Sequence, residues 1–231
     1  MHMPLILYTW YTARWCVMLC ARYSVSLRPV KKVVWGASGS LTSPGETYPA
    51  WVRPSEMHLA STNENVVGIA LDDYPYQNLT DLVQLRQQLE RDNAVSRAKF
   101  PDKAPLELYT TFYIKDLNVS GVERFLSHIE HPILWSWSPS DVPSMMSEYW
   151  DAFEAVSGAG RMLGLYAYDF SAPDGGALFP LDTMRKQLDW ALLLLRAKRV
   201  HGIAFEGLWD LDLAAAEMLR EWIAKVKDIS L

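Results

Sequence analysis

Residues 68–72 read GIALD and residues 202–206 read GIAFE, so the same short apolar run ending in an acid occurs twice. In a β-strand, alternate side chains point to opposite faces. The large apolar residues of each run therefore share one face, and the glycine, the alanine and the final acid share the other. A strand with large residues toward covering helices and small residues toward a crowded interior is typical of a (β/α) barrel. The two runs predict an α/β fold, a TIM-like (β/α) barrel, with Asp72 and Glu206 at its mouth.

The chain from residue 66 onward supports this fold class, because strand and helix patterns alternate along it. The expected strands are 66–72, 106–114, 132–138, 161–168 and 201–206. The expected helices are 79–92, 120–129, 144–157, 182–198 and 213–227. The last of these carries a one-sided apolar stripe at helical spacing. Alternating β and α elements predict parallel strands joined by crossover helices.

The first 65 residues give a weaker pattern. Residues 5–12 and 30–36 are two further strand candidates, and 37–65 is expected to be a long mouth loop with a short helix near 54–60. This makes seven strands, so either one strand is cryptic, or the barrel is open, or the chain lacks its start. No linker is visible, and we expect one domain over residues 1–231, regular from 66 to 231 and poorly defined before that.

Composition narrows the classes of partner. The 231 residues are 50% hydrophobic, which is ample for a core, and the formal net charge is −5. No cluster of lysine and arginine stands out, so we expect no nucleic-acid partner. No apolar segment is long enough to span a membrane and no clear signal peptide is present, which predicts a cytoplasmic protein. The histidines form no ligand set, and Cys16 and Cys20 are expected to be a reduced pair, so no metal or other cofactor is expected. The oligomeric state stays open.

Four acids at expected strand ends are candidate catalytic residues. Side chains alternate, so Asp72 is assigned to the mouth and Asp73 to the loop; helix capping is the structural alternative for both. Glu206 has apolar neighbours, which favour the protonated form that a general acid needs, and its alternative is an ion pair with a basic residue such as Arg161. Asp169 faces away from the small-residue face and is the weaker candidate, expected to hold the neighbouring loop.

Aromatic residues crowd the same strand ends, and the chain has ten tryptophans. Flat rings stack on the apolar faces of sugars, and their polar tips hydrogen-bond hydroxyl groups. The alternative is plain core packing, to which many of these rings must belong. The candidate substrate-binding residues are Tyr74, Trp135, Trp137, Tyr166, Tyr168 and Trp209.

Five segments between Gly68 and the end of the chain form a recognisable set: residues 68–74, 134–137, 164–170, 180–182 followed by Gln187, and 202–206. On these residues the chain resembles a group of uncharacterised (β/α)-barrel proteins that look like glycoside hydrolases. The resemblance covers about 160 residues, about two-thirds of a barrel. It implies a barrel of the glycoside-hydrolase kind, but the family has no firm activity to transfer.

We therefore hypothesise a glycoside hydrolase-like protein that acts on a small-molecule or oligosaccharide ligand. Glu206 would be the general acid and Asp72 the base or nucleophile. If Leu5 starts the first strand, these acids lie on the third and seventh strands. The two carboxylates would then lie on opposite sides of the mouth. That wider separation would favour inversion, for which about 6.5–9.5 Å is expected, over retention, for which about 5–5.5 Å is expected. A non-catalytic carbohydrate-binding barrel would keep the aromatics and hold an acid in a salt bridge.

A third hypothesis, a nicotinamide-dependent oxidoreductase, rests on one turn. Gly36 and Gly39 follow a strand pattern at the separation of a dinucleotide-binding motif. Thr42 stands where the third glycine belongs, and Pro44 breaks the helix that would receive the pyrophosphate. A plain turn after a strand is therefore the better interpretation, and no nicotinamide cofactor is expected.

Overall fold

The computed structural model describes residues 5–7, 33–36, 62–71, 79–136, 138–158, 160–169, 171–172, 176–206, 211–226 and 229. The chain divides into two compact units. The first unit contains residues 1–9, 112–123 and 132–231, and the second unit contains residues 10–111 and 124–131. The single domain expected from the sequence stays a prediction, and each unit is described by itself.

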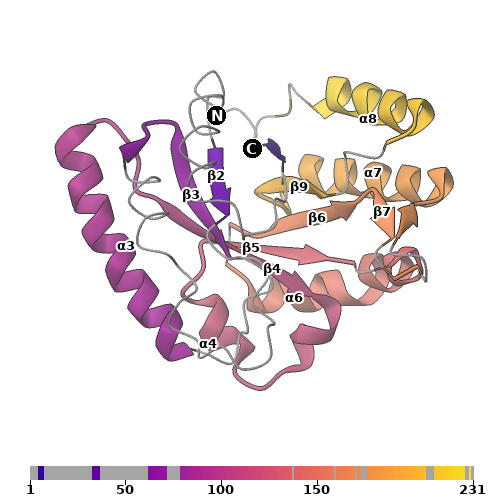
Figure 1. Ribbon diagram of the computed structural model, residues 1–231. Helices are drawn as coiled ribbons and strands as arrows, with labels where there is room; N and C mark the ends of the chain where they lie inside the picture. Colours follow the sequence, from indigo (N-terminus) through magenta and orange to yellow (C-terminus); the bar gives the residue numbers. More distant parts are fainter. Residues whose placement is uncertain are drawn as a thin grey trace. The chain divides into compact units, whose positions relative to one another are not determined.

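The second unit is built from parallel strands and one long helix. Strands β2 (Val33–Gly36), β3 (Val66–Leu71) and β4 (Glu107–Tyr113, whose last two residues lie beyond the unit boundary) pair in parallel in this order. Helix α3 (Leu79–Lys99) follows β3 in the chain and precedes β4, and Figure 1 shows it as the long magenta helix. A leucine stripe on α3 is buried, formed by Leu82, Leu85 and Leu89. This β–α–β order is the predicted one.

Helix α3 runs seven residues beyond the predicted end at residue 92. The apolar stripe stops there, but the same face continues with the buried polar residues Asn93 and Ser96. The Asn93 amide group takes the place of a backbone partner for Leu106, because its Oδ1 accepts the Leu106 N–H at 2.7 Å and its Nδ2 donates to the Leu106 carbonyl at 3.4 Å. A polar residue with such a partner can be buried, so hydrophobic periodicity alone ended the helix too early.

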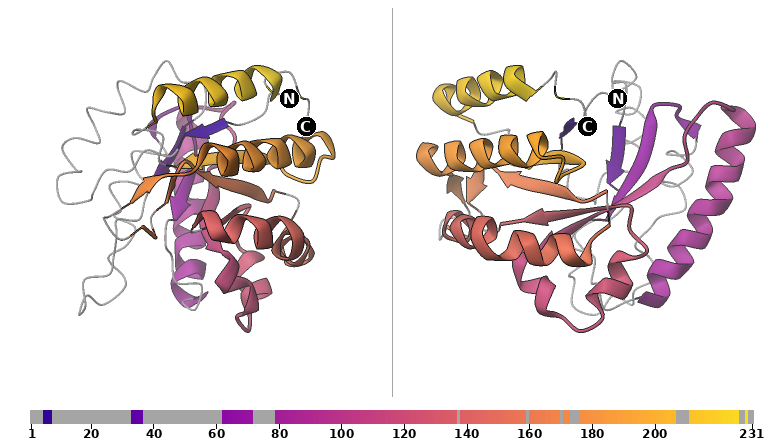
Figure 2. Two further views of the ribbon diagram at one scale, coloured as in Figure 1. Left: turned by 90° about the vertical axis from the view of Figure 1, so that its right-hand side faces the viewer. Right: turned by 180° about the vertical axis from the view of Figure 1, so that it is seen from behind.

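Among its described residues, the first unit has four parallel strands. Its sheet follows the order β1 (Leu5–Leu7), β9 (Gly202–Glu206), β6 (Met162–Tyr166) and β5 (His131–Trp135, which begins one residue before the unit boundary). Strands β7 (Tyr168–Asp169) and β8 (Ala177–Leu178) form a separate antiparallel hairpin. Helices α7 (Leu181–Arg196) and α8 (Leu213–Val226) lie side by side in Figures 1 and 2.

Short helical turns join the remaining elements. They are η2 (Ile114–Asn118), α4 (Val122–Leu126), η3 (Pro139–Asp141), α5 (Val142–Ser144), the π-helical turn η4 (Met145–Tyr149) and α6 (Trp150–Val156). The helix expected over 120–129 is thus only α4, and the strand expected to reach residue 138 ends at Trp135. Pro139 begins η3 soon afterwards, where a residue without an N–H can start a helical turn but cannot continue a central strand.

The large residues of β9 face the helices, as the alternation predicts. The Phe205 and Trp222 rings meet edge to face at 5.6 Å, which joins β9 to α8. The Trp222 indole N–H in turn donates to the Leu188 carbonyl of α7 at 2.7 Å. Ile203, on the same face as Phe205, is fully buried. Buried aromatic and aliphatic surface of this kind is the dominant favourable term in such a core.

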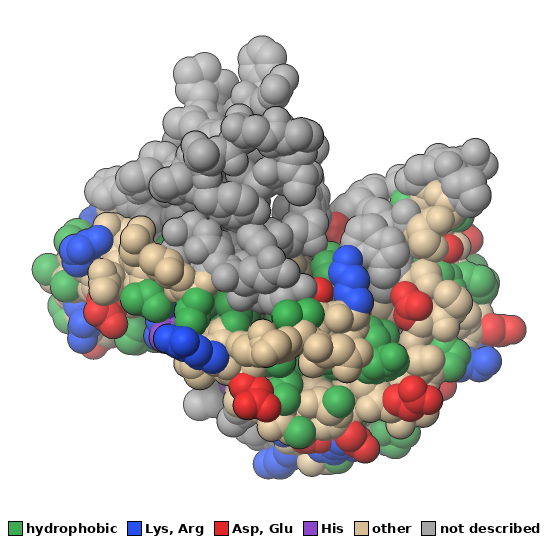
Figure 3. All heavy atoms as spheres, turned by 90° about the horizontal axis from the view of Figure 1, so that it is seen from below, with side chains coloured by type: hydrophobic (Ala, Val, Ile, Leu, Met, Phe, Trp, Pro, Cys, Tyr) green, Lys and Arg blue, Asp and Glu red, His purple; other side chains and the backbone are tan. Residues whose placement is uncertain are grey.

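On one face of the described residues, charged side chains of both signs lie in mixed arrangement. Figure 3 shows one face, on which acidic and basic groups are interspersed with apolar and uncharged atoms. No helix among the residues described here has the length and apolar character needed to cross a membrane.

Candidate functional site

The carboxyl ends of β5, β6 and β9 bring three candidate residues of the first unit to one edge of its sheet. Trp135, Tyr166 and Glu206 are the last residues of these three strands. Tyr166 and Glu206 are register partners in neighbouring parallel strands, so their side chains leave the same face of the sheet. The Trp135 and Tyr166 rings lie 4.7 Å apart with their planes tilted by 38°. All three side chains are buried, Glu206 with 3% exposure.

The small residues of the strand pattern make room for this arrangement. A Cβ atom at Gly164 would overlap the indole ring of Trp135, so the ring lies directly on the backbone of β6. Gly164 and Tyr166 share a face by alternation, and Ala204 and Glu206 share it on the next strand. Phe205 faces α8, so this is the face away from the covering helices. The acid of β9 therefore leaves the sheet on its small-residue face.

The second unit has the same kind of close contact between a strand glycine and an aromatic ring. A Cβ atom at Gly68 of β3 would overlap the ring of Tyr109, which comes from the neighbouring strand β4. Gly68, within the GIALD run, and Gly164, on the strand beside the GIAFE run, are thus each covered by an aromatic ring. Glycine in a strand interior often marks such a close approach. The pattern of small residues indicated crowding, but it did not indicate that single rings fill the space.

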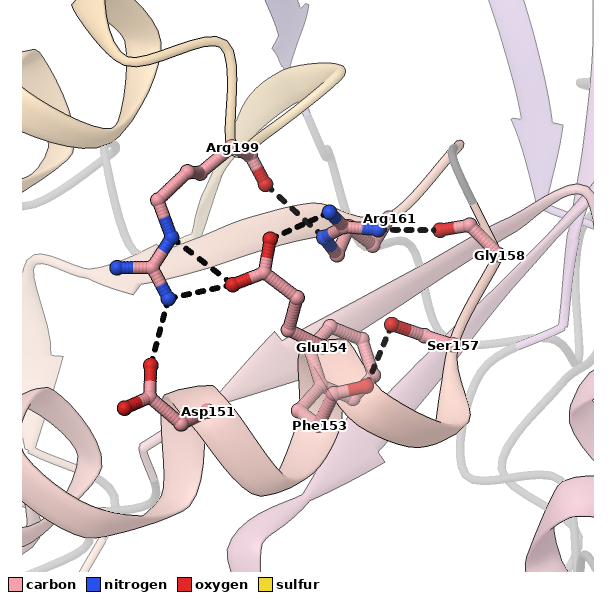
Figure 4. Close-up of polar contacts among 7 residues, drawn as sticks. All are labelled: Asp151, Phe153, Glu154, Ser157, Gly158, Arg161 and Arg199. Carbon is pink, nitrogen blue, oxygen red and sulfur yellow. Dashed lines mark hydrogen bonds and ion pairs between the residues drawn. The ribbon is translucent and has the colours of Figure 1, made fainter.

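Arg161 does not serve as the partner of Glu206 that the sequence suggested. Figure 4 shows its guanidinium between the Glu154 carboxylate and the Gly158 carbonyl, with a further bond to the Arg199 carbonyl at 3.0 Å. It lies just before β6, at the opposite end of the strands from Glu206. The Glu154 carboxylate is shared with the Arg199 guanidinium, and these hydrogen bonds hold the pKa of Glu154 below its ordinary value.

Asp169 and Tyr168 lie on the β7–β8 hairpin that follows β6. One carboxylate oxygen of Asp169 accepts the Ser171 N–H at 2.9 Å and the Ser171 hydroxyl at 2.6 Å. The carboxylate thus stabilises the turn of the hairpin, a contact typical of aspartate in turns. The half-buried Tyr168 ring covers Gly176, which has a φ of +123° that favours glycine.

Five of the predicted site residues lie outside the described residues: Asp72, Asp73, Tyr74, Trp137 and Trp209. Their assignments stay predictions. Leu71, the residue before Asp72, is described as the last residue of β3, and its carbonyl accepts a hydrogen bond from the Thr110 hydroxyl at 3.1 Å. The turn that suggested a dinucleotide is described only up to Gly36, the end of β2, so the nicotinamide hypothesis also stays untested.

Gln187 is a residue near this site to which the sequence assigned no role. It lies on α7, is 1% exposed, and its Nε2 donates to the Tyr166 carbonyl at 3.4 Å. The available signal was a glutamine within the apolar stripe of a helix, where its neighbours are leucine, methionine and alanine. A buried polar side chain in such a stripe calls for a specific partner.

The second unit has a separate polar cluster at the amino ends of its strands. The His131 Nε2 lies 2.8 Å from a Glu107 carboxylate oxygen, and the His131 ring stacks on Tyr109 at 4.4 Å. A pocket beside Glu107 is also lined by Arg86 and Glu130, which form an ion pair at 2.6 Å. Barrel enzymes carry their sites at the carboxyl ends of the strands, so this cluster is at the wrong end for catalysis. In the described part of the chain, no group of histidine, cysteine and acidic residues could hold a metal ion.

Sequence comparisons identify no relative, because no protein-family model matches the chain and no curated protein matches it. Solved structures are similar. A chitinase from Chromobacterium violaceum has a TM-score of 0.50 at 15% identity, over 97% of this chain and 99% of that one. A GH18 chitinase from Cycas revoluta, solved in complex with (GlcNAc)3, has a TM-score of 0.55 at 11% identity, over 93% and 86%.

A third similar structure is a GH128 endo-β-1,3-glucanase from Amycolatopsis mediterranei in complex with laminarihexaose. Its TM-score is 0.50 at 15% identity, over 89% of this chain and 88% of that one. At these identities the likeness shows the fold alone. The chain has an α/β fold, a TIM-like barrel of the kind found in glycoside hydrolases.

Proposed function

We propose that this glycoside-hydrolase-like barrel acts on a carbohydrate, with Glu206 as its general acid and Asp72 as the second carboxylate. One observation carries the proposal: the Glu206 carboxylate is buried at the carboxyl end of β9, on the same face as Tyr166 and beside the ring cluster of Trp135. The chitinases and the glucanase of similar fold are proteins that act on polysaccharides, which supports carbohydrate as the substrate class.

The chemistry asked of Glu206 follows from its surroundings. Burial disfavours the charged form of a carboxyl group, and a general acid must carry a proton when the substrate binds. A protonated Glu206 can donate its proton to the glycosidic oxygen as the bond to the sugar carbon breaks. Asp72 would then activate the water that attacks this carbon, or attack it directly and form a covalent intermediate. Asp72 follows Leu71, and by alternation belongs to the face of Gly68.

The aromatic candidates take different parts in this proposal. Trp135 is 1% exposed and its ring packs against Tyr166 and Gly164, so it would support the site from within and not stack on a sugar. Tyr168, on the β7–β8 hairpin, is half-buried and so leaves part of its side chain accessible. It is therefore a better candidate than Trp135 for stacking against a sugar ring. Trp137 and Trp209 complete the proposed platform on the strength of their positions after β5 and β9.

Substitution of the acid tests the proposal. We expect Glu206→Gln to keep the fold and any sugar affinity but to lower kcat by about 10²–10⁴-fold, the usual contribution of positioned proton transfer. Asp72→Asn should be similarly damaging. The assay is hydrolysis of a panel that includes chitin and β-1,3-glucan oligosaccharides, with affinity measured separately by calorimetry.

Glu217→Gln is the matched control, because Glu217 is an exposed glutamate on α8 and should not affect turnover. Sugar binding by the wild type without turnover would replace the hydrolase with a carbohydrate-binding barrel. Turnover that survives Glu206→Gln would exclude this acid. Neither binding nor turnover over the whole panel would remove the carbohydrate proposal.

A further inference from the structure

The buried face of α7 contains one residue that does not fit its surroundings. Its buried residues are Met184, Gln187, Leu188, Trp190, Ala191, Leu194 and Leu195. Gln187 alone in this set carries a polar group at the end of a long aliphatic stem. It is 1% exposed, which is less than several of its apolar neighbours. The glutamine thus occupies a position at which a helix of this kind normally carries an apolar side chain.

The amide of Gln187 hydrogen-bonds a peptide group at the end of β6. Its Nε2 donates to the Tyr166 carbonyl at 3.4 Å, a long hydrogen bond. The N–H of the same peptide group, which belongs to Ala167, donates to the Glu206 carbonyl at 2.9 Å. The peptide between Tyr166 and Ala167 therefore connects the side chain on α7 to the backbone of the proposed general acid.

This peptide lies where the regular sheet stops. Tyr166 and Glu206 are the last register partners of β6 and β9. Beyond them the Ala167 carbonyl accepts the N–H of Phe179, and the chain turns into the hairpin. A peptide at such a break has fewer ladder bonds to fix its orientation than one inside a sheet. The contact from α7 supplies an additional restraint at this point.

The other end of the Gln187 amide shows that the residue is not optimised for stability. Its Oε1 is buried and accepts no hydrogen bond from any residue that the structure describes. A buried acceptor without a donor is destabilising, and an apolar side chain of the same length would remove it. Methionine would fill similar space among the leucines of α7 without leaving such an atom. Among the described residues, the hydrogen bond that Gln187 makes is therefore through its donor group.

We propose that Gln187 is a positioning residue for Glu206, acting through the peptide between Tyr166 and Ala167. This inference rests on the proposed function. By holding that peptide, Gln187 fixes the Cα atom of Glu206 and the direction in which its carboxyl group leaves the strand. Displacements of about 1 Å at a catalytic group can cost about 10²-fold in rate, so a remote restraint of this kind has a large effect.

The decisive variant is Gln187→Met, which keeps the volume and removes the donor. We expect its melting temperature to equal or exceed that of the wild type, because the buried acceptor is lost. Hydrogen exchange of the Ala167 amide, followed by NMR, should become about 10-fold faster, while that of Leu163 inside β6 stays unchanged. In the hydrolysis assay kcat should fall about 10-fold with KM unchanged.

Two further variants separate the restraint from ordinary packing. Leu188→Met changes the neighbouring buried side chain of α7 and should leave both Ala167 exchange and kcat at wild-type values. Gln187→Glu retains a donor while its carboxyl is protonated. Its Ala167 protection and kcat should therefore approach wild-type values at low pH and fall as the pH rises.

A purely structural role for Gln187 would not make Gln187→Met lower kcat while it keeps or raises the melting temperature. If Gln187→Met lowers the melting temperature and leaves Ala167 exchange unchanged, the inference is overturned. The same holds if exchange rises but kcat does not change in an active enzyme. A wild type without any turnover would remove the proposed function and, with it, the positioning role, while the exchange data would still decide whether the tether exists.

Discussion

At the scale of single residues, close contact between glycine and an aromatic ring shapes the candidate site. The Trp135 ring occupies the space that a side chain at position 164 would need, and it also contacts Tyr166. The identity of residue 164 is therefore dictated by a residue on another strand. Overpacking of such a contact forces shifts in side chains and backbone.

We expect Gly164→Ala to lower the free energy of unfolding by about 1–3 kcal/mol, because the new methyl group overlaps the indole ring. Urea denaturation followed by circular dichroism measures this difference. Gly158→Ala is the matched control in the same unit, since a Cβ atom there would meet nothing within 4 Å. Its effect should be within about 0.5 kcal/mol. Equal effects of the two variants would contradict the role given to the Trp135 ring.

At the scale of elements, an ion-pair network joins α6 to the segments that lead into β6 and β9. Glu154 of α6 bonds both Arg161 and Arg199, and Asp151 bonds Arg199 at 2.6 Å (Figure 4). The side chain of Glu154 is 25% exposed and that of Asp151 is 79% exposed. Glu154 should therefore contribute more to the stability of the fold than Asp151, because ion pairs exposed to water contribute little.

We expect Glu154→Gln to lower the free energy of unfolding by about 1–2 kcal/mol at neutral pH, after allowance for its partial exposure. The hydrogen bond from Arg199 holds the pKa of the Glu154 carboxyl below its ordinary value of 4.5. Its contribution is therefore complete above pH 4.5 and is lost as the pH falls through the lowered pKa.

The measurement is urea denaturation of wild type and variant across this acidic range. The stability difference should shrink steadily as the solution is acidified. Asp151→Asn is the comparison on the same helix and should cost less than about 0.5 kcal/mol. A difference between wild type and Glu154→Gln that does not depend on pH would show that the network acts through shape alone.

Over the chain as a whole, the periodicity of apolar residues predicted the fold class. It did not predict the features that depend on contacts between residues far apart in the sequence. Alternation correctly placed Phe205 toward α8, because facing helices is a local property of a strand residue. The break after Tyr166 could not be predicted, since it depends on bonds from Ala167 to Glu206 and from Phe179 to Ala167. The extension of α3 was missed for the same kind of reason, because Asn93 finds its partner 13 residues away. Of the candidate site, Tyr166 and Glu206 are register partners on one face of the sheet and Asp72 lies outside the described residues, so the roles given to these residues stay predictions.

The close contact between the Trp135 ring and Gly164 also predicts that the stability of a variant without this ring can be changed by an added small molecule. Removing it with Trp135→Ala leaves an indole-shaped void whose floor is bare backbone, so no side chain at position 164 can move in to fill it. Engineered apolar voids bind small aromatic molecules. Added indole should therefore raise the melting temperature of Trp135→Ala but not that of Gly164→Ala, in which the space is still occupied. Adding or removing a small aromatic compound would then change the stability of the candidate site within one sample, without a further substitution.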